Sequence, residues 1–120
     1  MANTHEVVSN GYPYLPLRME VQGQSEDNLA LLDTGYTESL IIPDRWRQRL
    51  GTPDGRTARE VGDGRIVHAP VYLGIIEIVG FPPIYGVAVT LLADEYIIGR
   101  RLLDRFEIIL DHGQRVIVRP

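Results

Sequence analysis

The chain has 120 residues, a formal net charge of −4 and no cysteine. This length predicts one domain with its own core. The lack of cysteine excludes disulfides, thiol catalysis and cysteine-ligated zinc. The acidic balance argues against a nucleic-acid partner, because nucleic-acid-binding proteins usually carry a basic stripe. The three histidines, His5, His68 and His112, show no metal-ligand spacing, so neither a metal site nor a cofactor is predicted.

No stretch approaches the ~20 apolar residues that cross a bilayer, and the first residues lack the features of a signal peptide. We therefore expect a cytoplasmic protein with no membrane partner. Residues 1–14 are polar and contain the turn-forming run 10–13, so they are expected to form a flexible N-terminal arm. A single domain is expected over 15–120.

The first predicted element is a β-hairpin that ends at Asp33. Its first strand shows a period of two, which is typical of a half-buried strand. The apolar positions of that strand are Leu15, Leu17, Met19 and Val21. Residues 23–27 are predicted to form the turn, and 28–33 the returning strand. The hairpin would deliver Asp33 to the interior, before a polar turn and a short apolar strand over 40–42.

A short helix is predicted over 43–51, because Pro43 and Asp44 suit its first turn and Gly51 would end it. Trp46 is interpreted as a core anchor for this helix, since a buried tryptophan contributes a large apolar area. Further along, Gly62, Asp63 and Gly64 lie between two extended runs. An Asp-Gly pair in this position indicates a β-hairpin tip.

From residue 70 onward the sequence predicts strand after strand. The expected strands are 71–79, 84–92, 96–98, 106–110 and 115–118, with one helical step over 100–105. Many short strands without a repeated βαβ unit indicate an all-β, barrel-like fold.

Two motifs in this pattern resemble a known family. The first is Leu31-Leu32-Asp33-Thr34-Gly35, followed by a short loop and a second apolar run. An Asp-Thr-Gly alone is also typical of an ordinary turn. The second motif, Tyr96-Ile97-Ile98-Gly99-Arg100-Arg101-Leu102-Leu103, leads from an apolar pair and a glycine into a short helix. Their order and separation resemble the single-lobe, retropepsin-like aspartic proteases.

This resemblance implies a closed β-barrel of the acid protease fold with one or two short helices, in which the hairpin around Asp63 is a flap over the substrate. It implies catalysis by Asp33, and, because one chain supplies one such aspartate, a homodimer that brings two together. Thr34 would bond the partner's backbone, while Gly35 and Gly99 would allow close approach of the backbone.

Two further residues follow from the resemblance. In retroviral members an arginine at the position of Arg100 pairs with an acid near the catalytic loop, so an Arg100–Glu38 pair is expected here. Tyr36 departs from the family, which places Ala or Ser there. Its phenol would fill a substrate subsite, donate a hydrogen bond to the catalytic carboxylates, or mark a member without proteolysis.

The functional prediction is an aspartic endopeptidase that binds extended peptides and uses no cofactor. An alternative is a catalytically inactive peptide-binding or dimerisation module on the same fold, in which Asp33 and Thr34 lock the interface. A third is a β-barrel fragment of a larger system whose function lies in a missing neighbour.

Overall fold

The computed structural model describes residues 4–120, which form strands joined by short turns and two short helices. The elements are β1 His5–Val8, β2 Tyr14–Val21, β3 Gln24–Leu32, β4 Leu40–Ile42, the 3₁₀ helix η1 Asp44–Gln48, β5 Gly55–Glu60, β6 Ile66–Ile78, β7 Ile84–Leu91, β8 Ile97–Ile98, α1 Arg100–Leu103, β9 Glu107–Asp111 and β10 Arg115–Arg119. The all-β prediction is confirmed. Within the described residues, neither helix has the length and apolar character needed to span a membrane.

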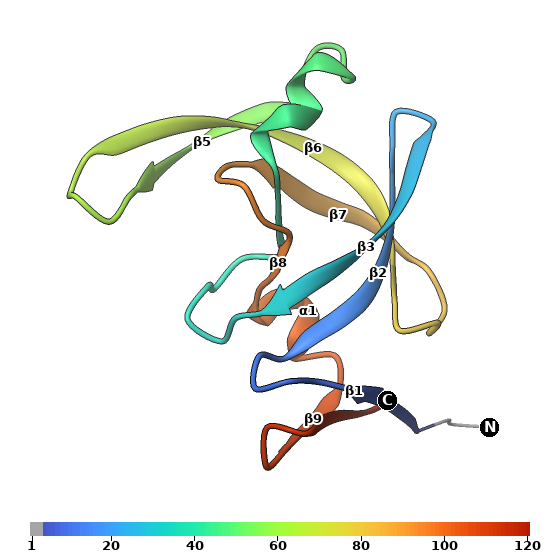
Figure 1. Ribbon diagram of the computed structural model, residues 1–120. Helices are drawn as coiled ribbons and strands as arrows, with labels where there is room; N and C mark the ends of the chain where they lie inside the picture. Colours follow the sequence, from blue (N-terminus) through green and yellow to red (C-terminus); the bar gives the residue numbers. More distant parts are fainter. Residues whose placement is uncertain (1–3) are drawn as a thin grey trace.

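Six strands close into a barrel. Their hydrogen-bonded order is β2-β3-β8-β4-β7-β6, and β6 pairs back onto β2. The ring of pairings closes the sheet on itself, although parts of some strands, such as β3 before Leu31, are paired on one side only, and β6 runs beyond the barrel to pair with β5. Figure 1 shows the barrel strands around a common interior, with the β5–β6 ribbon extending to one side.

The barrel interior is filled by the apolar side chains that the period-two pattern marked. Leu15, Leu17, Met19 and Val21 are all buried, as predicted. Trp46 is fully buried, which confirms it as a core anchor, and its indole N–H donates a 2.8 Å hydrogen bond to the Tyr96 hydroxyl. The helix that carries Trp46 is a 3₁₀ helix over Asp44–Gln48, shorter than the predicted 43–51.

The turn between β2 and β3 is tighter than the sequence suggested. Only Gln22 and Gly23 form it, and both have a positive φ. A two-residue turn needs this conformation to match the right-handed twist of its two strands. The polar residues 25–27, predicted as turn, belong to β3. They are compatible with the strand because two of them, Ser25 and Asp27, point to solvent.

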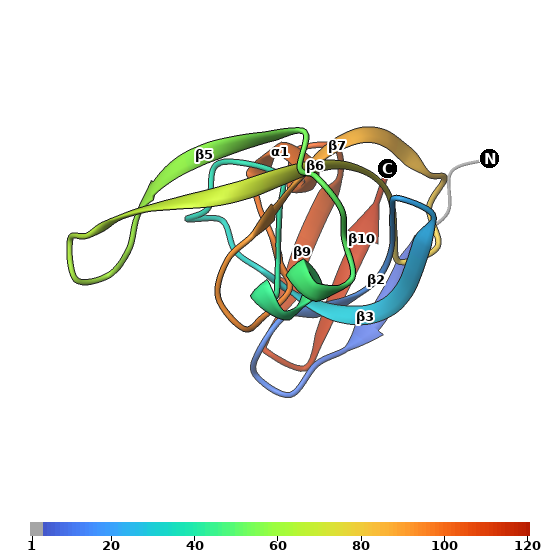
Figure 2. The ribbon, with the colours of Figure 1, turned by 90° about the horizontal axis from the view of Figure 1, so that it is seen from above.

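β6 is a 13-residue strand that continues through Pro70, where the sequence suggested two separate segments. Proline is tolerated at this point because β5 alone is paired there, and the pairing with β7 starts at Val71. The first part of β6 forms the hairpin with β5, and the rest forms the barrel wall. Figure 2 shows this hairpin projecting beyond the barrel.

A second sheet, β1-β10-β9, packs below the barrel and joins the two ends of the chain. His5 pairs with Val118, and Val7 packs against the core. Within the predicted arm of residues 1–14, His5–Val8 therefore form a strand, whereas residues 1–3 lie outside the described residues. This differs from the expected loose arm because the partner strand lies more than a hundred positions away, where no local pattern reveals it.

Candidate active site

The loop 33–39 after β3 is built around the segment that follows β8. β8 lies between β3, to which it is parallel, and β4, to which it is antiparallel. The Asp33 N–H donates to the Ile98 carbonyl at 3.0 Å, and the Gly99 N–H donates to the Ser39 carbonyl at 2.8 Å. The loop therefore leaves the barrel and returns to it on either side of one short strand, which fixes both of its ends.

Asp33 is half-buried at the start of this loop. Its Oδ1 accepts a 2.8 Å hydrogen bond from the Gly35 N–H, and its carbonyl accepts one from the Tyr36 N–H at 3.2 Å. The other carboxylate oxygen forms no hydrogen bond within the described residues. Thr34 and Gly35 beside it are exposed. Asp33 thus presents a fixed, accessible carboxylate on the surface of the barrel.

Gly99 has no room for a side chain. A Cβ at this position would lie 2.2 Å from the Glu38 carbonyl oxygen, 2.6 Å from Tyr36 Cδ2 and 2.8 Å from the Tyr36 carbonyl oxygen. Real Cβ atoms do not approach other atoms this closely, so the loop can wrap around this segment only if residue 99 is glycine.

The expected Arg100–Glu38 pair is not formed. Arg101 Nε lies 3.2 Å from Glu38 Oε2, whereas Arg100 Nη2 lies 3.6 Å from Oδ2 of Asp104, the residue that follows its own helix. Successive residues on a helix point about 100° apart, so a shift of one position changes which arginine faces the loop. Arg100 instead contributes its backbone, because its N–H donates to the Tyr36 carbonyl at 2.8 Å.

Tyr36, on the 33–39 loop, is half-buried and faces the β5–β6 hairpin. The guanidinium carbon of Arg59, on β5, is 5.6 Å from the centre of the Tyr36 ring, within the range of a cation–π contact. The phenol oxygen is buried, and no group of residues 4–120 meets hydrogen-bond geometry with it. Burial raises the pKa of the Tyr36 phenol, against a smaller opposite effect of the neighbouring Thr90 and Arg59.

The predicted hairpin around Asp63 is present, and its ribbon passes over the 33–39 loop (Figures 1 and 2). Gly62, Asp63 and Gly64 form the exposed tip, with Gly64 at a φ of +85°. The Val61 N–H donates to the Arg65 carbonyl, which makes a three-residue loop with glycine in the left-handed position. The contact of Arg59 with Tyr36 connects this hairpin to the loop of Asp33.

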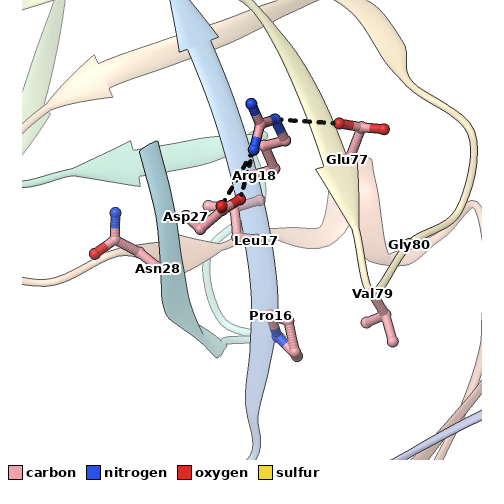
Figure 3. Close-up of a pocket in the computed structure, with 8 residues that line it drawn as sticks. All are labelled: Pro16, Leu17, Arg18, Asp27, Asn28, Glu77, Val79 and Gly80. Atoms are coloured by element: carbon pink, nitrogen blue, oxygen red, sulfur yellow. Dashed lines mark hydrogen bonds and ion pairs between the residues drawn. The ribbon is translucent and has the colours of Figure 1, made fainter. Parts of the chain in front are cut away.

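A second candidate binding site is a groove of about 280 Å³ on the barrel wall between β2, β3 and β6. Figure 3 shows Arg18 there, between Asp27 and Glu77, with which it forms ion pairs at 3.1 and 3.7 Å. The cation is therefore neutralised by its neighbours. Asp27 lies on β3, six residues before Asp33 at the end of that strand, or about 20 Å along an extended chain. This groove is therefore separate from the loop of Asp33.

Sequence reasoning did not mark Arg59 as part of the site. No pattern in residues 55–60 marks it, and only the structure shows that Thr57 and Arg59 are half-buried while their neighbours are exposed. Within residues 4–120, no cluster of three or more His, Asp or Glu side chains could hold a metal ion.

No protein-family model matches this sequence, and none of the curated proteins matches it either. Among solved structures, the chain is similar to a retropepsin-like aspartic protease from Rickettsia conorii. The TM-score is 0.63 at 15% sequence identity, and the match covers 99% of this chain and 94% of that one. At this identity the likeness is one of fold: the chain has the retropepsin-like barrel.

Proposed function

We propose that this chain is an aspartic endopeptidase that acts as a homodimer, with Asp33 of each protomer forming the catalytic pair. The observation that carries the proposal is the loop 33–39: it holds an accessible carboxylate at the end of a barrel strand and closes around Gly99, on a barrel of the retropepsin-like fold. The β5–β6 hairpin above the loop supplies a cover for an extended peptide.

Peptide hydrolysis by carboxylates requires two of them sharing one proton. The ionised one takes a proton from water, whose oxygen attacks the peptide carbonyl carbon, while the protonated one donates to the carbonyl oxygen. The tetrahedral intermediate then loses the amine, which leaves with a proton. Two like charges in contact repel each other, so the two carboxylates share one proton rather than ionise together.

One chain has one Asp33, so the second carboxylate would come from a second copy across a two-fold axis. Thr34 supports this arrangement, because it is exposed beside Asp33 and its hydroxyl is not used within the described residues. In the dimer that hydroxyl would bond the partner's backbone and hold the two loops together.

The test is cleavage of an unbiased peptide library between pH 3 and pH 7 by the wild type, by Asp33→Asn and by Asp94→Asn. Asn keeps the size of the side chain but cannot share the proton. Asp94 is exposed and forms no ion pair within residues 4–120, so Asp94→Asn is the matched control. We expect cleavage by the wild type and the control, and none by Asp33→Asn. Equal cleavage by all three proteins would refute the proposal.

Mixing tests the shared pair directly. With a ninefold excess of Asp33→Asn and free exchange of subunits, about nine tenths of the wild-type protomers fall into mixed dimers. Activity per wild-type protomer should then drop to about one tenth. The same excess of Asp94→Asn should cause no such drop. Undiminished activity in the Asp33→Asn mixture would show that one protomer suffices.

A further inference from the structure

Arg59 differs from most arginines of this chain because its charge is not neutralised. Eight of the twelve basic residues form ion pairs with carboxylates, whereas Arg59 forms none within the described residues. It is nevertheless half-buried, on the face of β5 that turns toward the body of the protein. A half-buried cation without a counter-ion is costly unless a partner supplies the negative charge.

Two hydrogen-bond donors are also left unused at the same place. Arg59 Nε and the Tyr36 hydroxyl are both buried, and neither has a hydrogen-bond partner in residues 4–120. The guanidinium lies over the Tyr36 ring, so the two donors belong to one contact between the hairpin and the 33–39 loop. A carboxylate has two acceptor oxygens and a negative charge, and would satisfy both donors and the cation together.

We propose that Arg59 and Tyr36 form a subsite for a carboxylate side chain of the peptide substrate, so that the enzyme prefers Asp or Glu at one position near the scissile bond. This inference rests on the proposed function. Arg59 belongs to the hairpin and Tyr36 to the 33–39 loop, so the two donors would face an entering carboxylate from two sides when the hairpin and the loop separate to admit a peptide.

The experiment uses a series of octapeptides with a constant apolar background, in which Glu, Gln or Lys is placed at each position in turn. Cleavage by the wild type is compared with cleavage by Arg59→Gln and by Arg56→Gln. Arg56 lies on the same strand, is exposed and forms no ion pair within residues 4–120, so it gives the same charge change on the opposite face.

We expect the wild type and Arg56→Gln to prefer Glu over Gln about tenfold in kcat/KM at one position, as for a charge-assisted hydrogen bond. Arg59→Gln should lose this preference, and Arg59→Glu should reverse it toward Lys. The preference should also grow between pH 3.5 and pH 6, as the substrate carboxyl, with a pKa of about 4.3, ionises. A purely structural role of Arg59 would produce neither the reversal nor this pH profile.

Binding of the same peptides to Asp33→Asn, measured by fluorescence anisotropy, separates the two proposals. A Glu preference in binding without any turnover by the wild type would refute the protease and keep the subsite. Turnover without a Glu preference at any position would keep the protease and refute the subsite. If Arg59→Gln lost the dimer but kept the peptide preference, the subsite would also be refuted. The charge of Arg59 would then contact the partner protomer and not the substrate.

Discussion

The close packing around Gly99 makes a graded prediction about stability. Replacing Gly99 by Ala places a Cβ 2.2 Å and 2.8 Å from two carbonyl oxygens of the 33–39 loop. Both belong to a backbone that is hydrogen-bonded on either side, so they cannot move away cheaply. Overpacking of this kind costs about 1–3 kcal/mol where side chains can adjust, and more where backbone must move. We expect Gly99→Ala to lower the free energy of unfolding by about 3 kcal/mol or more.

Two other glycines complete the series. At Gly74 a Cβ would meet the Glu20 carbonyl oxygen and Val21 Cγ2 at 3.0 Å, which neighbours can partly relieve, so we expect a loss of about 1–2 kcal/mol. At Gly62 nothing lies within 4 Å, and its φ is not in the left-handed region. Gly62→Ala should therefore stay within about 0.5 kcal/mol of the wild type.

Urea unfolding followed by the fluorescence of Trp46, the only tryptophan and fully buried, measures all three. With a slope of about 1.5 kcal/mol per M, the Gly99→Ala midpoint should fall by about 2 M. A Gly99→Ala variant as stable as Gly62→Ala would show that the loop does not wrap around this segment as described. Equal losses at positions 74 and 99 would show that the backbone there yields as readily as side chains.

Two further predictions concern single polar contacts. Tyr96→Phe removes the hydroxyl that accepts from the buried Trp46 indole, so it should cost about 1–3 kcal/mol in the same urea experiment, and a loss below 0.5 kcal/mol would contradict that hydrogen bond. Arg115, and then His112, lower the pKa of the Asp111 carboxyl, so the stability that Asp111 adds is present above its unfolded pKa of about 3.9 and is lost as the pH falls through its lower folded pKa. The melting temperature of Asp111→Asn should therefore lie below that of the wild type at pH 7 and converge with it near pH 2; a difference that is independent of pH would contradict the assignment.

The sequence predicted those elements whose signal is local. β2 was visible because Leu15, Leu17, Met19 and Val21 all face one core, and the tip near Asp63 because Gly64 needs a positive φ. β1 could not be predicted, because its partner strand β10 lies far along the chain. The β2–β3 turn was placed too late, because polar residues 25–27 look like a turn although they extend β3.

At the site, residue types were more predictable than pairings. The carboxylate of Asp33 and the need for glycine at position 99 follow from short motifs. Whether Arg100 or Arg101 faces Glu38 depends on one residue of helix phase, which the motif does not determine. The contact of Arg59 with Tyr36 depends on how the hairpin curves over the loop, and no spacing in the sequence encodes that curvature.

Because β6 is one continuous strand, the length of the β5–β6 hairpin that covers the loop can vary. Its first part belongs to the hairpin and its later part to the barrel wall, so the hairpin grows out of the wall without a joint. Inserting two residues on each side of the tip would preserve the alternation of faces and move the tip outward by about 7 Å. No residue pair of the barrel would change, so evolution or design can adjust the span of the cover independently of barrel stability.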